Sequence, residues 1–224
     1  MNKFRLYFFS FMAVLALSFQ SCNDDDDSYS LGDIAVDWAT VVSETPGTYY
    51  LVGDTWGTMW PAATAIPLYN PEDGQRVMVV FNPLYDDFEG FDHAVKVEDV
   101  QEILTKDVEM LTEENNEEFG NDPIYIEQGN MWVSGEHLNI IFRYMHPLQQ
   151  KHRVSLVTSA LEVDAEGYIP VDLRYNTYQD TSNLWMEGSV SFRLKPLIEL
   201  PGSKGIRLTM NSPENGIKEL KYDF

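Results

Sequence analysis

The second half of this chain alternates apolar and polar side chains with a period of two residues, and this alternation restricts the fold more than any other feature. Within residues 137–144, one set of alternating positions holds Leu138, Ile140, Phe142 and Tyr144. The other set holds His137, Asn139, Ile141 and Arg143. Successive side chains of a β-strand point to opposite faces of a sheet, so the pattern predicts strands with one core face and one solvated face.

Seven short segments of the second half carry strand patterns, and residues 216–222 add a candidate eighth. The seven are residues 124–127, 131–133, 137–144, 153–158, 168–174, 189–194 and 206–210. Seven short strands at this spacing are typical of a β-sandwich of the immunoglobulin type, here without the usual cysteine pair. We therefore predict a C-terminal β-sandwich over residues 119–224.

The first half also predicts strands, at residues 34–42, 48–52, 75–81 and 92–104. A short capped helix is predicted at residues 112–119, because Thr112 precedes Asn115 by three positions and acidic residues would occupy the first turn. Gly120 directly follows this segment. The helix marks the predicted boundary between a first domain at residues 34–118 and the sandwich, in an all-β chain.

The N-terminus has the features of an export signal over residues 1–21, with Lys3 and Arg5 before an apolar stretch. A membrane-spanning helix needs about 20 apolar residues, and this stretch is shorter. Cys22, the only cysteine, follows directly. The pattern resembles a lipobox, in which the cysteine receives a diacylglyceryl group, although Phe19 stands where Leu or Val is usual. A free thiol behind an ordinary secretory signal is the alternative.

Several acyl chains on Cys22 would anchor the mature protein, because each buried CH₂ contributes about 0.8 kcal/mol. Residues 22–33 are then an acidic tether that contains Asp24, Asp25, Asp26 and Asp27. This run resembles the acidic export signal that directs Bacteroidetes lipoproteins to the outer face of the outer membrane; a solvated spacer is the alternative. We expect a lipid-anchored outer-membrane protein that is exposed at the cell surface.

The charge of the chain bears on its partners and on its domain organisation. Removal of residues 1–21 leaves 36 acidic and 13 basic residues, and hence a formal charge of −23. Nucleic-acid binding depends on Lys and Arg that displace counterions, so nucleic acid is not expected as a partner. Residues 34–111 carry 14 acidic and 3 basic residues, whereas residues 123–224 carry 12 and 10. This asymmetry favours two separately built domains.

Several strand segments, together with the lipobox and the acidic tether, resemble a known family. The segments are QEILTK at 101–106, LNIIFRY at 138–144, HRVSLV at 152–157, VDLRYN at 171–176 and GSVSFRL at 188–194. They are similar to the NigD-like family of Bacteroidetes lipoproteins over nearly the whole chain. The resemblance implies an N-terminal OB-fold barrel, a C-terminal β-sandwich and association with a bacteriocin operon in the founding member. It implies no catalytic residues.

A dense aromatic stretch in the first domain contains Tyr49, Tyr50, Trp56, Trp60 and Tyr69. OB-type barrels often bind extended ligands through aromatic stacking, and exposed Trp and Tyr also suit sugars or peptides. Trp56, Trp60 and Tyr69 are therefore our candidate ligand-binding residues. Large aromatic side chains are also common core residues with one polar edge at the surface, and this alternative stays open.

Two clusters contain residue types that can bind a metal ion, but the spacing of neither cluster predicts a metal site. An acidic cluster surrounds Gly90 and consists of Asp86, Asp87, Glu89 and Asp92. It lacks the ligand spacing of an EF-hand, so a solvated turn is the simpler interpretation. Three histidines stand at His137, His146 and His152. They lack the i, i+4 spacing of a helical zinc motif, and no cysteine can join them, so neither a metal nor a cofactor is expected.

Sequence motifs give little support for an enzyme. The chain contains no nucleophile elbow, P-loop or dinucleotide-binding glycine motif. Paired carboxylates for glycoside hydrolysis depend on a separation that only the fold sets. We predict a non-enzymatic envelope lipoprotein that presents a binding surface to a protein, peptide or glycan. The alternatives are an accessory of bacteriocin immunity or export and a hydrolase of surface polysaccharide.

Overall fold

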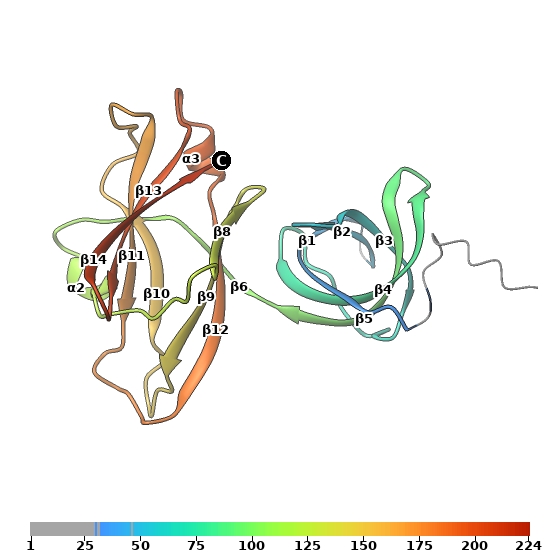
Figure 1. Cartoon of the computed structure of the whole chain (residues 1–224), viewed down its shortest axis with the longest axis horizontal. Helices are drawn as coiled ribbons and strands as arrows, with labels where there is room; N and C mark the ends of the chain where they lie inside the picture. Colours follow the sequence, from blue (N-terminus) through green and yellow to red (C-terminus); the bar gives the residue numbers. More distant parts are fainter. Residues whose placement is uncertain (1–29, 31, 46) are drawn as a thin grey trace, which may run out of the picture.

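The computed structural model describes residue 30, residues 32–45 and residues 47–224. The predicted signal peptide, Cys22 and the aspartate run Asp24–Asp27 lie outside the described residues. Within the described part, strands dominate and form an N-terminal barrel and a C-terminal sandwich (Figure 1). None of the described helices has the length and hydrophobicity that a membrane span requires.

Five strands close the N-terminal barrel. They are β1 (Ala35–Thr45), β2 (Thr48–Gly53), β3 (Gly57–Thr64), β4 (Arg76–Phe88) and β5 (Phe91–Glu102). The strand order is β1-β2-β3-β5-β4, with β3 parallel to β5 and with β1 antiparallel to β4, which closes the barrel. The predicted barrel is thereby confirmed. Its core contains Ala39, Val41, Leu51, Met59, Val77, Val79, Phe81, Val95 and Val97.

One barrel strand was not predicted. It is β3, which contains Gly57 and Pro61, two residue types that usually interrupt strands. Pro61 is accommodated because the pairing of β3 with β5 shifts register between Pro61 and Ala63, and irregular positions are where a strand tolerates proline.

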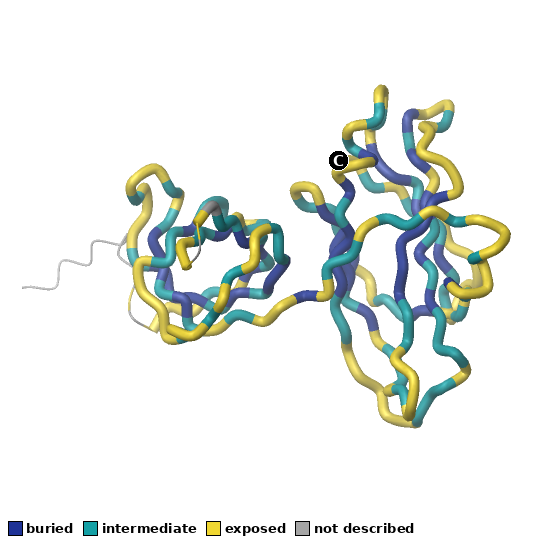
Figure 2. Tube along the Cα trace, turned by 180° about the vertical axis from the view of Figure 1, so that it is seen from behind, coloured by how far each residue is buried: buried dark blue, intermediate teal, exposed yellow. Residues whose placement is uncertain are grey.

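The C-terminal sandwich consists of two sheets around one core. The five-stranded sheet has the order β14 (Gly216–Asp223), β13 (Gly205–Ser212), β11 (Tyr168–Asn176), β10 (Arg153–Thr158) and β7 (Glu109–Met110). The four-stranded sheet has the order β6 (Leu104–Asp107), β12 (Trp185–Arg193), β9 (His137–Met145) and β8 (Met131–Ser134). Figure 2 shows buried residues along the barrel wall and along both sheets. The predicted sandwich is confirmed.

Two details of the sandwich differ from the sequence prediction. Residues 124–127 do not form a strand: Tyr125 makes only an isolated bridge to Arg143, and the amide of Ile124 donates to the carbonyl of Asn211 in the opposite sheet. The sandwich also begins before the predicted boundary at residue 118, because β6 pairs with β12 and β7 pairs with β10. The domains therefore meet at Ile103, between β5 and β6.

The predicted helix at residues 112–119 is shorter in the structure and lies inside the sandwich. Helix α2 spans Asn116–Phe119, and a second short helix, α3, spans Lys195–Ile198. The Thr112 hydroxyl accepts a hydrogen bond from the amide of Asn115, and the Asn115 side chain accepts one from the amide of Thr112. Reciprocal bonding therefore forms a turn before α2 instead of extending the helix.

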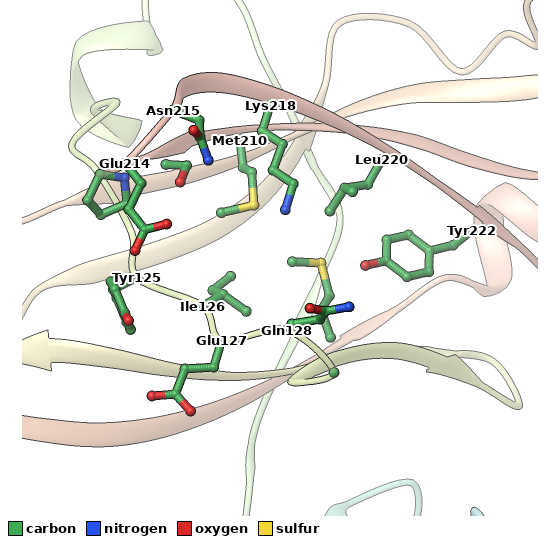
Figure 3. A pocket seen from close by; sticks show the side chains of 14 residues that line it. Tyr125, Ile126, Glu127, Gln128, Met210, Glu214, Asn215, Lys218, Leu220 and Tyr222 are labelled. Atoms are coloured by element: carbon green, nitrogen blue, oxygen red, sulfur yellow. The ribbon is translucent and has the colours of Figure 1, made fainter.

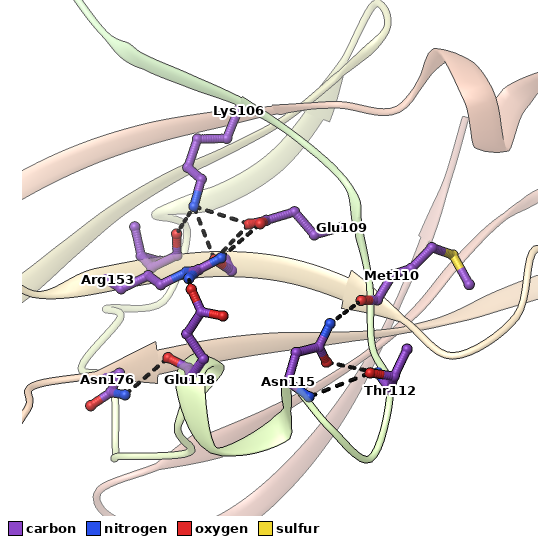
Figure 4. Close-up of polar contacts among 10 residues, drawn as sticks. Lys106, Glu109, Met110, Thr112, Asn115, Glu118, Arg153 and Asn176 are labelled. Atoms are coloured by element: carbon purple, nitrogen blue, oxygen red, sulfur yellow. Dashed lines mark hydrogen bonds and ion pairs between the residues drawn. The ribbon is translucent and has the colours of Figure 1, made fainter.

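Ion pairs fasten the segment after the barrel to the sandwich (Figure 4). Lys106 Nζ donates to the carbonyl of Val154 at 2.7 Å. Arg153 pairs with Glu109 at 2.7 Å and also contacts Glu118 in α2. Residues 106–118 are thus held along β10, which explains why the domain boundary precedes them.

The two domains meet at a polar contact that we call the domain seam, formed by Trp38, Asp54, Arg76, Trp132 and Asn139. Arg76 Nη2 lies 2.8 Å from Asp54 Oδ2 and 3.1 Å from Asn139 Oδ1. Trp132 Nε1 and Asn139 Nδ2 each donate to Asp54 Oδ2 at 3.2 Å. The Trp38 and Trp132 rings meet edge to face with centroids 4.8 Å apart. Buried, hydrogen-bonded charges of this kind fix one geometry, so the seam orients the barrel against the sandwich.

Candidate functional site

The three aromatic residues predicted to bind ligand lie in separate ring pairs. Trp56 packs edge to face on Phe81 of the barrel core, with ring centroids 5.1 Å apart. Tyr69 meets Tyr49 at 5.6 Å. The ring of Trp60 meets that of Phe91. Trp56, Trp60 and Tyr69 thus each have a different ring partner in the described structure.

Trp60 belongs to a half-exposed row of rings on the barrel. The Trp60 and Phe91 centroids are 5.2 Å apart, and Phe91 lies 5.3 Å from Tyr50. The row borders a hollow of about 340 Å³, which we call the aromatic hollow. Its lining residues are Val42, Thr45, Thr48, Tyr49, Tyr50, Trp60 and Phe91. None of them belongs to the domain seam.

The position of the aromatic hollow follows from strand geometry. Met59 points into the barrel core and is fully buried, so its neighbour Trp60 on β3 points outward. Tyr50 precedes the buried Leu51 on β2 and likewise points outward. Phe91 opens β5 after the turn at Gly90. Alternation could have identified Tyr50 and Trp60 together, whereas no sequence signal brings Phe91 to them.

The chemistry of the aromatic hollow suits a ring or an apolar side chain. Its lining contains four aromatic residues and the hydroxyl-bearing side chains of Thr45, Thr48, Tyr49 and Tyr50. Aromatic faces with a few hydroxyls match the stacked face of a sugar or the apolar side chain of a peptide. Among the described residues that line the hollow, none carries a carboxylate.

Tyr69 lies in a different environment at the barrel. Burial, together with nearby Tyr49, Glu102 and Glu72, raises the pKa of Tyr69 to about 12. Its buried hydroxyl has no hydrogen-bond partner among the described residues. Tyr69 therefore contributes a neutral phenol and packs against Tyr49, which itself lines the aromatic hollow.

The acidic cluster around Gly90 forms the turn between β4 and β5. Asp87 and Glu89 have φ angles of 51° and 49°, so the turn itself uses strained backbone. Asp92 accepts hydrogen bonds from the amide and the hydroxyl of Thr58, which lower its pKa. Asp86 pairs with His93 at 2.6 Å. The carboxylates thus point to separate partners, and the described residues contain no group of three or more side chains arranged to hold a metal.

The three histidines of the second domain are also separated. His137 lies beside the seam, where burial and the nearby Arg76 and Arg193 lower its pKa to about 4. His152 bonds to the Tyr175 hydroxyl at 2.5 Å and to the carbonyl of Asp180 at 2.6 Å, so it fastens a loop. His146 is exposed. No zinc site is formed by this set.

The buried carboxylates of the barrel have structural partners. Asp37 accepts hydrogen bonds from the amides of Thr55 and Trp56, both at 3.0 Å. Asp54 is bound to Arg76 in the seam. Neither carboxylate lines the aromatic hollow or the larger groove at the sandwich.

A larger groove of about 630 Å³ lies at one side of the sandwich (Figure 3). The segment with Tyr125, Ile126 and Glu127 forms one wall, and the inward side chains of β14 form the other. Between the walls lie Met131 of β8 and Met210 of β13.

Comparison with known proteins shows the same two-domain architecture. The sequence model of the NigD-like N-terminal OB domain matches residues 38–103, and that of the NigD-like C-terminal beta sandwich domain matches residues 107–224. These ranges agree with a domain junction at Ile103. No functionally curated protein matches the chain.

Solved structures agree with this architecture. A protein from Parabacteroides distasonis, described as toxin related, shares 32% identity and a TM-score of 0.75, over 86% of this chain and 93% of its own. A protein of unknown function from Bacteroides vulgatus shares 25% identity and a TM-score of 0.76, over 86% and 91%. A NigD-like immunity protein from Bacteroides caccae has the same fold at 18% identity and a TM-score of 0.64, over 86% and 93%. The chain therefore belongs to the NigD-like family.

Proposed function

We propose that this chain is a non-enzymatic lipoprotein of the cell envelope, anchored through Cys22, that presents a binding surface to a protein, peptide or glycan outside the cell. The aromatic hollow of Tyr50, Trp60 and Phe91 is the observation that carries this proposal. Its rings are half-exposed and in mutual contact, and they take no part in the seam. Outward aromatic rings on a rigid barrel are a common basis of ligand recognition.

The domain seam also supports a binding role, because it fixes the orientation of the barrel. Because Arg76, Asp54 and Asn139 hold the barrel in one orientation, a partner meets a preorganised surface. Preorganisation lowers the entropic cost of binding. The bonding of the buried carboxylates Asp37 and Asp54 to backbone amides and to Arg76 supports a scaffold over a catalyst.

Substitution of Trp60 tests the binding surface. A glycan array and a displayed peptide library are probed with the wild-type chain, with Trp60→Ala and with a control, Leu68→Ala. Leu68 is 95% exposed and lies outside the hollow. We expect Trp60→Ala to weaken binding of the recovered ligands roughly tenfold or more, as for an aromatic hot spot, and Leu68→Ala to leave it unchanged. Equal binding by Trp60→Ala and wild type would contradict the proposal.

A stability control separates binding from folding. Trp56 packs on the barrel core, so Trp56→Ala should cost about 3–5 kcal/mol of unfolding free energy. Trp60→Ala should cost clearly less, because Trp56 packs against the barrel core and Trp60 does not belong to that cluster. Urea denaturation of both variants measures the difference.

The anchoring half of the proposal has its own test. Labelled palmitate should enter the wild-type protein, and Cys22→Ala should release the protein from the membrane fraction. A Cys22→Ala variant that stays in the membrane would refute the lipid anchor and leave the binding surface to be judged separately.

A second candidate function is an accessory role in bacteriocin immunity or export through contact at the envelope. The observation that favours it is the pair of family members described as a toxin-related protein and an immunity protein. Deletion of the gene should change bacteriocin sensitivity or secretion, and unchanged values for both would argue against this role.

A further inference from the structure

The last strand of the sandwich, β14, has an unpaired edge in the described structure. It pairs antiparallel with β13 on one side and ends the order of its five-stranded sheet on the other. Its side chains are mostly exposed, and Ile217 is 65% exposed. A free edge of eight residues is a template for pairing with another strand.

The hydrogen-bond pattern shows which residues of β14 face outward. The amide of Phe224 donates to the carbonyl of Lys204, in register with the β13–β14 ladder. The carbonyl of Asn211 accepts from Ile124 and so points away from β14. In an antiparallel ladder, bonded and non-bonded positions alternate, so the even-numbered residues of β14 bond to β13. The outward backbone groups belong to Ile217, Glu219, Lys221 and Asp223.

The four residues whose backbone groups face away from β13 include charged side chains that are self-complementary in one register. Two antiparallel copies of β14 can be paired so that Glu219 of each copy stands opposite Lys221 of the other. In this register Ile217 stands opposite Asp223, and Leu220 stands opposite Leu220 on the two-fold axis. Opposite charges that face each other across strands are favourable, and like charges are unfavourable. A shift of two residues in either direction sets Glu219 against Glu219 or Lys221 against Lys221.

The side chains of Glu219 and Lys221 already lie on the outer face of the sheet. Glu219 is 3.2 Å from Arg207, and Lys221 is 2.5 Å from Glu166. A carboxylate has a second oxygen and an ammonium group has three donors, so each can also bind a partner across the new ladder. The pairing would extend an existing network of charges.

The inward face of β14 gives a further reason for pairing. Leu220 and Tyr222 pack against the sandwich core, and with Lys218 they form one wall of the open groove. In the self-complementary register, the partner's β14 would bring the same side chains alongside them. The two grooves would then become one continuous channel beneath a joined sheet.

We propose that the partner of the β14 edge is a second copy of this chain, and that two copies pair through β14 about a two-fold axis at Leu220. The contact joins two five-stranded sheets into one sheet of ten strands. Such a two-fold contact is isologous, because each copy contributes the same surface. A contact confined to one strand is small, so the dimer forms in a concentration-dependent manner.

Charge substitutions test the pairing directly. The full chain with Cys22→Ala is studied by sedimentation velocity over the widest concentration range that it tolerates, and we expect a monomer–dimer equilibrium. Lys221→Glu sets acid against acid, and Glu219→Lys sets base against base, so each should weaken dimerisation at least tenfold. An equimolar mixture of the two variants should recover a heterodimer, because both cross-strand pairs are again of opposite sign.

A disulfide test checks the register. Cys22 is the only cysteine, so Leu220→Cys in the Cys22→Ala chain places a single thiol on the proposed axis. Opposed non-bonded positions have Cα atoms about 4.5 Å apart, within the disulfide range. Oxidation should therefore cross-link Leu220→Cys. Lys218→Cys is the matched control and should not cross-link, because Lys218 stands opposite Tyr222.

The outcomes divide clearly. Dimerisation that is lost in the single charge variants and recovered in their mixture supports the proposal, as does cross-linking of Leu220→Cys in excess of Lys218→Cys. A chain that sediments as a monomer at every concentration overturns it. So does a dimer that neither charge variant weakens. Circular dichroism checks that each variant folds, and exposed ion pairs contribute little to folding, so no variant should unfold.

Discussion

The sandwich has two surfaces that the alternating sequence alone cannot distinguish. The outer face of β9 and β12 lies under the barrel, where Asn139 and Ser191 are fully buried and hydrogen-bonded to each other at 2.6 Å. The outer face and free edge of β14 carry comparable polar residues, yet Glu219 and Lys221 stay exposed. Similar polar positions thus have opposite environments, because a second domain covers one surface and leaves the other open.

This difference shows where the molecule depends on polar contacts. In the seam, Arg76 is 1% exposed and its Asp54 partner 9%, so loss of either leaves a buried charge without a counter-charge. On β14, water can replace any lost ion pair. Single substitutions in the seam should therefore lower the unfolding free energy. Substitutions at the β14 edge should leave the unfolding free energy nearly unchanged and should weaken only the association of two copies.

The largest effect is expected from Asp54→Ala. Removal of this carboxylate leaves Arg76 buried and deprives Trp132 and Asn139 of an acceptor, so we expect a loss of about 3–5 kcal/mol of unfolding free energy. Glu72→Ala, an exposed carboxylate of the same barrel, is the control and should change stability by about 0.5 kcal/mol or less. Equal denaturation midpoints for the two variants would show that the seam contributes no stability.

The next effect is a pH dependence from His137. Its pKa is about 4 in the folded chain, below the ordinary 6.5, so between these values the unfolded chain binds a proton that the folded chain does not. Stability is then fully present above about pH 6.5 and falls with pH by roughly 3 kcal/mol by about pH 4. His137→Gln should remove this slope in urea titrations. His146→Gln, at an exposed position, should retain it, and a slope that persists in His137→Gln would contradict the assignment.

The smallest effect is expected at the free edge. Ile217→Thr alters a side chain that is 65% exposed, so the unfolding free energy should change by no more than about 0.5 kcal/mol. Leu208→Ala, on the neighbouring strand β13, removes a fully buried side chain and should cost about 2–5 kcal/mol. Thermal melts of the two variants compare edge and core directly, and similar losses would mean that β14 is covered in solution.

Sequence reasoning predicted the fold well and the candidate site only in part. The predicted strands at residues 137–144 and 153–158 are confirmed, because alternation reports directly which side chains face a core. Strand β3 was missed because Pro61 resembles a loop residue, and only its pairing with β5 shows that it occupies an irregular position. Residues 124–127 look like a strand locally but cross between sheets.

The aromatic residues show the same limit at the candidate site. Trp56 and Trp60 stand four positions apart in one aromatic stretch, yet one packs on the barrel core and the other lines the outer hollow. Phe91 completes the hollow from a strand that is remote in sequence but runs beside β3. Strand pairing across the barrel, which local sequence does not encode, decided which rings meet.

Strand content and the division into two domains could be predicted before the fold was known, because period, turn residues and charge distribution are local properties. The resemblance to the NigD-like family rests on particular strand segments, such as residues 138–144 and 188–194. Tertiary structure alone decided that Asn139, His137 and Arg76 are buried and that the edge of β14 is open. A period of two tells which side of a strand a residue occupies. It does not tell what covers that side, and burial, charge pairing and pKa all depend on what covers it.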